Sequence, residues 1–280
     1  IKSGNSVILR GGKEAYYSNT ALASLFKKAL KANGISQDCV QLVETLDREA
    51  ILHLVHETEN IDMVIPRGGE ALIKYVSENS RIPVLKHYKG QCHVYIDKDA
   101  DFKMAESIVV NAKVQRPGVC NAMETLLIDE KFPKQSSYKI IKALLNKGVV
   151  LRGCPKTVKL CSEVAKASEA DYHNEYLDLK ANVRIVSGVK AAADHIAKFG
   201  SAHTDAIVTK NRKKAEEFIS LVDSSSVMWN VSPRLADGGE YGLGAEIGIS
   251  TDKLHSRGPM GAYDLTTYKW VVIGNGQIRK

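Results

Sequence analysis

The chain has 280 residues, of which 44% are hydrophobic and 25% are charged. These values are typical of globular proteins, and the length suffices for one large domain or two ordinary ones. No apolar run approaches the roughly 18 residues of a membrane-spanning helix, so we expect no membrane partner. The net charge of +7 comes from basic residues interspersed with acidic ones. It indicates either a solvated surface or attraction to an anionic substrate or cofactor phosphate.

Other function classes are disfavoured by what the sequence lacks. Aromatic residues make up only 6%, and there is no basic helix or stacking motif, so we expect no nucleic-acid partner. The five cysteines are scattered without a CxxC pair, and the eight histidines form no HExxH or HxH pair. This argues against a disulfide framework and against a metal site, and favours a reducing, cytoplasmic location. The chain opens at Ile1 without an initiator Met, so we expect it to begin within a domain.

Strands and helices alternate in the first part of the chain. Apolar runs and turn signals predict strands at 6–10, 40–43, 61–65 and 84–85. Helical spacing predicts helices at 18–32, 48–56 and 70–78. This alternation predicts a parallel sheet with helical crossovers.

The second part continues the same pattern. Strands are expected at 92–96, 125–128, 149–151, 181–185, 206–208 and 227–229. Helices are expected at 99–113, 138–147, 189–199 and 213–221. Glycine-rich loops follow between 238 and 259, where the backbone can approach a ligand closely. The apolar segment 269–273 reads as a last strand, which needs a partner in its own sheet or in another subunit.

Cys120 is the first candidate for chemistry. It follows a Pro117-Gly118 turn and precedes an apolar stretch, which can hold its sulfur at the mouth of a cleft. An unpaired cysteine in such a place is either a nucleophile that attacks an acyl carbon or a buried structural thiol.

Two turns suit a phosphate group. Gly68 and Gly69 lie between a predicted strand and a predicted helix, where N–H groups of the helix start can meet a phosphate, although a simple tight turn explains them as well. Arg10 and Lys13 flank Gly11-Gly12 at a strand end, as cofactor-phosphate or ribose ligands or as part of a solvated turn.

Three further residues are candidate substrate ligands. Arg234 and Arg257 lie in Pro/Gly loops, where a guanidinium either binds a carboxylate or phosphate in bidentate fashion or forms a surface salt bridge. His87 follows a strand end and can line a cleft, or it is a structural histidine.

Taken together, several longer strings resemble the γ-glutamyl phosphate reductase (glutamate-5-semialdehyde dehydrogenase) family of the aldehyde dehydrogenase superfamily. The resemblance extends over the whole chain, and the strings that carry it are 65–69, 82–87, 90–95, 117–127, 203–209 and 241–250. It implies an aldehyde dehydrogenase-like α/β fold whose first third is absent. The implied parts are a truncated, parallel-sheet NADP-binding domain (1–87), a catalytic domain (88–250) and a return segment with an oligomerisation arm (251–280).

The resemblance also implies a reaction, which belongs to proline biosynthesis. Cys120 attacks L-glutamyl 5-phosphate, phosphate leaves, and NADPH reduces the thioester to L-glutamate 5-semialdehyde. Gly68 and Gly69 match the turn that faces the cofactor pyrophosphate, and Arg10 or Lys13 matches the region at the adenosine ribose and its 2′-phosphate. Glu175 matches the glutamate near the nicotinamide ribose. The oxyanion-binding Asn of the superfamily falls in the absent stretch.

The superfamily's general-base glutamate is also missing, and His87 lies in that region. This departure disfavours the first alternative, a hydrolytic aldehyde dehydrogenase, because only hydrolysis needs an activated water. A second alternative is an inactive fragment, or the reductase part of a bifunctional kinase–reductase chain. The resemblance further implies a homo-oligomer, a dimer or a tetramer.

Overall fold

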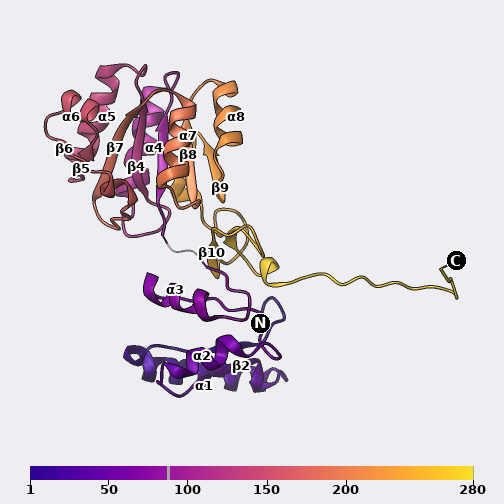
Figure 1. Cartoon of the computed structure of the whole chain (residues 1–280). Coiled ribbons are helices and arrows are strands. Elements are labelled where there is room, and N and C mark those ends of the chain that lie inside the picture. The colour runs from indigo at the N-terminus through magenta and orange to yellow at the C-terminus, as the bar shows by residue number, and fades with distance from the viewer. Residues whose placement is uncertain (87–88, 280) are drawn as a thin grey trace.

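The computed structural model describes residues 1–86 and 89–279. The first part contains two short strands and three helices: β1 (Val7–Leu9), α1 (Tyr16–Ala32), β2 (Val40–Leu42), α2 (Glu49–His56) and α3 (Glu70–Asn79). β1 and β2 pair in parallel, as the alternating pattern predicts. Figure 1 shows this part as a separate layer below the main sheet.

Two predicted strands of the first part form a single isolated bridge instead of a ladder. The segments 61–65 and 84–85 meet only in an isolated parallel bridge between Val64 and Val84. The amide of Leu85 donates to the carbonyl of Val64 at 2.9 Å, so the pairing direction is as expected but the ladder stops there. Pro83 precedes the bridge and Pro66 follows it, and proline contributes no N–H to a ladder.

A seven-stranded sheet forms the main body, with the order β6-β5-β7-β4-β3-β8-β9. Its strands are β3 (Cys92–Ile96), β4 (Met123–Asp129), β5 (Val150–Gly153), β6 (Ala165–Lys166), β7 (Lys180–Val186), β8 (Thr204–Val208) and β9 (Ser226–Trp229). Every neighbouring pair is parallel. The six strands expected here are confirmed, and the two-residue β6 was missed because it is too short to show a pattern.

Helices cover both faces of this sheet (Figure 1). They are α4 (Phe102–Val114), α5 (Lys134–Asn146), α6 (Pro155–Leu160), α7 (Val189–Phe199) and α8 (Arg212–Leu221). One core cluster packs residues of α4 and α5 against the sheet, and a second packs α7 and α8 against the other face. β3 and β4 are buried along their whole length, as expected for central parallel strands.

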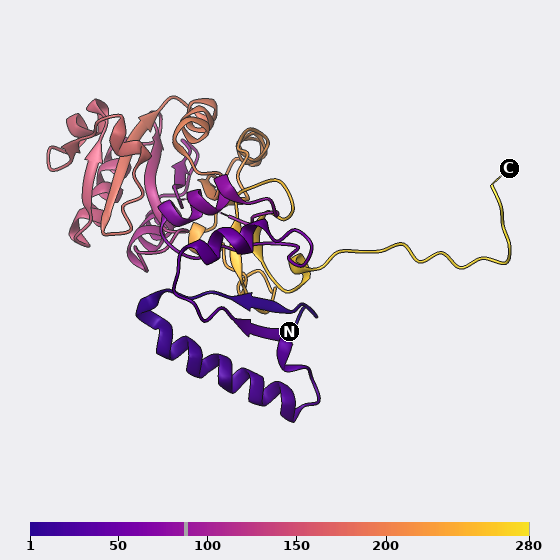
Figure 2. The ribbon, with the colours of Figure 1, turned by 60° about the horizontal axis from the view of Figure 1, so that its bottom comes forward.

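The chain then returns toward its beginning. β10 (Gly248–Ser250) and β11 (Gly258–Met260) form a small antiparallel sheet. Figure 2 shows this returning segment beside the first part of the chain, and the Asn5 side-chain amide donates to the carbonyl of Leu265 at 2.7 Å. The expected boundary at 250/251 falls within this sheet, and the one at 87/88 lies outside the described residues, so the division into domains stays a prediction.

The last predicted strand is wrong for the single chain. Residues 269–273 form neither helix nor strand and extend away from the body (Figure 1). Trp270 and Ile273 are 87% and 91% exposed. A strand exists only by pairing its backbone, and the described part of this chain offers the segment no partner.

A polar cluster lies beneath α7. Nδ1 of His93 donates to Oδ1 of Asp205 at 2.8 Å, and an Arg184 guanidinium nitrogen lies 3.0 Å from Nδ1 of His195. His195 is only 4% exposed. Burial lowers the pKa of His195 to about 2, helped by the nearby His93 and Arg184. The imidazole is therefore neutral in the folded protein at pH 5 to 7.

We predict that this buried imidazole makes the fold acid-sensitive. The unfolded chain takes up a proton at His195 below its ordinary pKa of 6.5, whereas the folded protein does not, so stability falls as the pH drops below 6.5. The loss is about 2 kcal/mol at pH 5, from about 1.4 kcal/mol per pH unit. In urea unfolding between pH 7 and 5, the His195→Gln variant should not show this loss of unfolding free energy. The His173→Gln variant, which changes an exposed histidine, should still show it. An equal acid loss in parent and His195→Gln would contradict the prediction.

Candidate active site

Cys120 lies at the amino end of a central strand. It is half-buried in the turn that joins α4 to β4, and the amide of Ala122 donates to the carbonyl of Val119 at 3.0 Å to close that turn. Because β3, β4, β7 and β8 are parallel neighbours, the residues that precede them meet at this same edge of the sheet.

Glu175 reaches this edge from the segment before β7. Its carboxylate accepts a hydrogen bond from the amide of Gly90, just before β3, at 2.8 Å. Burial raises the pKa of the Glu175 carboxyl, and the bond to Gly90 partly offsets this. The structure thus brings Glu175 to Cys120, although the two are far apart in the sequence.

Burial and two nearby carboxylates hold the Cys120 thiol protonated. Burial, together with the carboxylates of Glu175 and Glu246, raises the pKa of the Cys120 thiol to about 11. Its own main-chain N–H and the Arg67 guanidinium act in the opposite direction. At neutral pH the sulfur is a thiol, so a proton acceptor has to act before it can attack an acyl carbon.

Arg67 and Glu246 are site residues that sequence reasoning missed. Both lie inside strings that were noticed, 65–69 and 241–250, but nothing in either string tells which other loop it faces. Arginine is suited to oxyanions, and that was the available signal.

Arg234 contacts the nucleophile turn. One guanidinium nitrogen donates to the Asn121 side-chain oxygen, and Nε donates to Gln115 Oε1 at 2.8 Å. The Asn121 amide nitrogen in turn donates to the carbonyl of Ala236 at 3.0 Å. Asn121 therefore links the turn that carries Cys120 to the loop after β9. Arg234, which donates to Asn121, lies next to this turn.

The other two expected substrate ligands are differently placed. Arg257 binds Asp223, with Nη1 2.7 Å from Oδ1 and Nη2 2.9 Å from the Asp223 carbonyl. Lys253, together with this ion pair, lowers the pKa of Asp223 to about 2. The guanidinium is thus engaged away from the sulfur, and this contact lends no support to a substrate role. His87 lies outside the described residues.

The turn expected to meet a cofactor phosphate precedes α3. Gly69 caps this ten-residue helix without any side-chain hydrogen bond, and both Gly68 and Gly69 are exposed. A Cβ on Gly69 would meet nothing within 4 Å, so the approach to the helix start is open. Free N–H groups at such a start fit an anionic group.

Arg10 and Lys13 differ in their availability. The Arg10 guanidinium donates to the carbonyls of Leu46 and Asp47 at 3.1 and 3.3 Å, which ties two loops together. Lys13 begins a short 3-10 helix with its side chain exposed, and among residues 1–86 and 89–279 the Lys13 ammonium has no hydrogen bond or ion pair. Of these two cations, Lys13 is therefore the more available to bind a ligand phosphate.

Neither a metal cluster nor a membrane span is present in the described part of the chain. No group of three or more His, Cys, Asp or Glu side chains gathers there as metal ligands. No helix there combines the length and the apolar character that crossing a bilayer requires.

Curated relatives are similar in sequence to this chain over nearly its whole length. A protein named "Gamma-glutamyl phosphate reductase" from Thermodesulfovibrio yellowstonii is 54% identical over 280 residues, which cover 100% of this chain and 67% of the relative. One of the same name from Nautilia profundicola is 51% identical over 278 residues, covering 99% and 67%. The chain thus spans about two thirds of the length of these relatives.

Solved structures share its fold. The gamma-glutamyl phosphate reductase of Thermotoga maritima superposes with a TM-score of 0.97 at 43% identity, over 99% of this chain and 67% of that one. An acetylating aldehyde dehydrogenase from Geobacillus thermoglucosidasius superposes with a TM-score of 0.70 at 17% identity, over 99% and 70%, which shows the fold alone. The model of the aldehyde dehydrogenase family matches residues 1–189. The chain therefore belongs to the aldehyde dehydrogenase family, among the γ-glutamyl phosphate reductases.

Proposed function

We propose that this chain reduces L-glutamyl 5-phosphate to L-glutamate 5-semialdehyde and phosphate, a reaction of proline biosynthesis. The observation that carries the proposal is the position of Cys120, half-buried at the edge where four central strands begin, with two carboxylates and a guanidinium around it. In the described part of the chain these groups are assembled around the sulfur, which does not favour the alternative of an inactive fragment.

Cys120 supplies the nucleophile. Its sulfur bonds to the acyl carbon of glutamyl phosphate, the carbon–oxygen bond to the phosphate breaks, and a thioester remains on the enzyme. The thiol proton passes to a nearby carboxylate. Glu175 and Glu246 both act on this thiol, and burial raises the pKa of each, which makes them better proton acceptors. The expected contact of Glu175 with the nicotinamide ribose stays a prediction.

Arg67 is suited to the leaving phosphate. It is exposed, it begins the open turn before α3, and its charge acts on Cys120 and on Glu246. A guanidinium there can bind phosphate oxygens in bidentate fashion while the carbon–oxygen bond breaks. Arg234, next to the nucleophile turn, is the candidate for the substrate carboxylate.

The cofactor site fits a dinucleotide phosphate. The open, uncapped start of α3 behind Gly68 and Gly69 suits the pyrophosphate, and the available Lys13 suits a 2′-phosphate, which favours NADP over NAD. A bound NADPH would supply the hydride that reduces the thioester. Arg10 shapes this region by holding the loop at Leu46.

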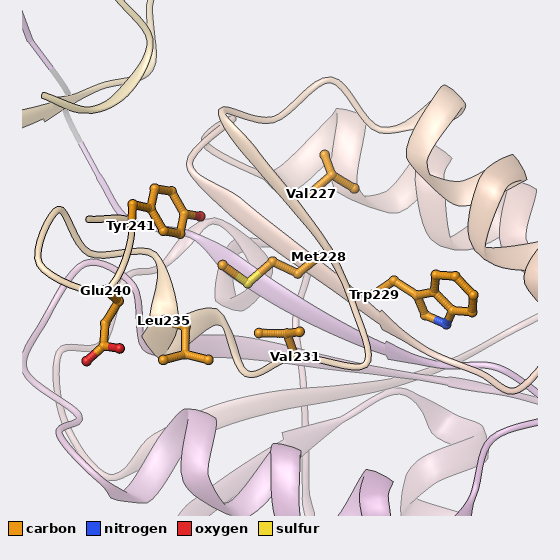
Figure 3. A pocket seen from close by; sticks show the side chains of 7 residues that line it. All are labelled: Val227, Met228, Trp229, Val231, Leu235, Glu240 and Tyr241. Carbon is orange, nitrogen blue, oxygen red and sulfur yellow. The ribbon is translucent and has the colours of Figure 1, made fainter. Parts of the chain in front are cut away.

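We further propose that the terminal segment pairs with a second copy of the chain. β9 is an edge strand of the seven-stranded sheet, and an apolar pocket of about 430 Å³ lies against it (Figure 3). Met228, Trp229 and Leu235 line this pocket. The exposed segment 269–273 offers the unpaired backbone and apolar side chains that such an edge takes up.

Cys120→Ala should abolish phosphate-dependent reduction of NADP⁺ with glutamate 5-semialdehyde, because the proposed thioester forms on the sulfur that this variant lacks. We expect a loss of at least about a thousandfold. Cys161→Ala, which removes another buried thiol, should keep the parent rate. Full activity of Cys120→Ala, or activity that does not need phosphate, would refute the proposed reaction.

Arg67→Gln should raise the KM for phosphate in the same assay by about 10- to 100-fold, the range of a lost charge-assisted hydrogen bond. Arg67→Lys should fall between this variant and the parent, since it keeps the charge without the fork. Lys74→Gln on α3, where the exposed Lys74 pairs with Glu78, serves as the charge control. An unchanged KM in Arg67→Gln would place the phosphate elsewhere.

Deleting residues 269–280 should lower the oligomeric state measured by sedimentation velocity, because the pairing segment is removed. The point variant Trp229→Lys at the edge strand should act in the same direction. The proposal is wrong if the shortened chain sediments like the parent at equal concentration.

A further inference from the structure

The main-chain carbonyl of Cys120 is held by a second thiol. Sγ of Cys92 donates to this oxygen at 3.1 Å, and Cys92 is completely buried. Cys92 is the first residue of β3, and it pairs in register with Met123 of β4, three residues beyond the nucleophile. The donor is therefore fixed by the two central strands of the sheet.

Gly90, two residues before Cys92, packs closely against the same carbonyl. A Cβ built on Gly90 would overlap the carbonyl oxygen and the Cα of Cys120, so only glycine allows this approach. Gly90 is buried, and its amide also donates to Glu175. Residues 90–92 thus touch both the backbone of the nucleophile and a carboxylate that acts on its sulfur.

This segment is itself anchored by two hydrogen bonds of Gln91, whose side chain is buried. The amide of Gln91 donates to Oγ of Ser201 at 2.8 Å, and the Gln91 side chain donates to the carbonyl of Tyr172 at 2.6 Å. Because Gln91 is held in place, the adjacent Cys92 thiol is held too, and its hydrogen bond restrains the position of the Cys120 carbonyl. The nucleophile turn, by contrast, is partly exposed and contains a Pro-Gly pair.

We infer that Cys92 is a positioning residue for the proposed nucleophile: its thiol holds the Cys120 carbonyl and thereby fixes the direction of the Cys120 side chain. The inference rests on the proposed function of Cys120. It explains why a polar, hydrogen-bonding thiol occupies a fully buried place at the start of β3. A methyl group would fill part of the volume but would leave the carbonyl without this donor.

The test compares Cys92→Ala with Cys92→Ser, which keeps a donor. Two properties are measured: phosphate-dependent turnover, and alkylation of Cys120 by iodoacetamide at pH 8, resolved by residue with mass spectrometry. Without the Cys92 donor, the turn that carries Cys120 relaxes toward solvent and away from Glu175, so the Cys120 thiol ionises more readily. We expect Cys92→Ala to alkylate about tenfold faster, the effect of one pKa unit, while kcat falls at least about tenfold and KM stays within about threefold.

The controls separate positioning from folding. Cys92→Ser should stay close to the parent in both properties, as should Cys161→Ala, which removes a distant buried thiol. Buried Cys161 should remain unmodified in Cys92→Ala, which reports an intact fold. Gly90→Ala is the second variant, because its Cβ displaces the same carbonyl and leaves both thiols present. We expect it to raise Cys120 alkylation as well.

Two results would overturn the inference. One is unchanged Cys120 alkylation in both Cys92→Ala and Gly90→Ala, and the other is an equal effect of Cys92→Ala and Cys92→Ser. Failure of the proposed function is distinct from these, since the parent would then lack phosphate-dependent turnover while Cys120 alkylation still responded to Cys92→Ala.

Discussion

The parallel pairing of β3, β4, β7 and β8 is the constraint on which the site depends. Parallel strands begin at the same edge, so the segments that precede them have to meet there whatever their separation in the sequence. Gly90, Cys120 and Glu175 come together for this reason. A shift of one residue in the register of β3 would turn Cys92 away from the Cys120 carbonyl.

Behind this edge a buried ion pair adds to the specification of the fold. Nζ of Lys113 on α4 lies 3.1 Å from Oε2 of Glu124 on β4, and neither side chain is exposed. The other Glu124 oxygen accepts from the amide of Leu177 at 3.4 Å, two residues past Glu175. Burial raises the pKa of Glu124 and lowers that of Lys113, so the pair is costly to desolvate. It joins the helix before the nucleophile to the segment that carries Glu175.

The electrostatics of the site oppose ionisation of the free enzyme's thiol. Burial and the two carboxylates outweigh the Arg67 guanidinium, which keeps Cys120 protonated. A protonated thiol is less open to oxidation than a thiolate. In the proposed reaction the carboxylates then act as proton acceptors, and the cation serves the phosphate. The same charges thus account for a protected sulfur before binding and for its activation afterwards.

Local sequence patterns determined the elements that have strong periodicity or clear turns. The strand at 92–96, the helix at 189–199 and the turn at Cys120 follow from apolar spacing and from glycine and proline, which act over a few residues. The resemblance of longer strings pointed to the family, and the relatives confirm it. Short elements such as β6 and α6 escaped because a few residues carry no period.

Only the tertiary structure decided which loops face the sulfur. Arg67 and Glu246 act on Cys120, while Arg257 is taken up by Asp223, and no local pattern distinguishes these residues in advance. The segment 269–273 has the composition of a strand but forms none, because pairing depends on a partner rather than on propensity. Sequence therefore set the residue types and the local elements, and the contacts between distant segments set their chemical environment.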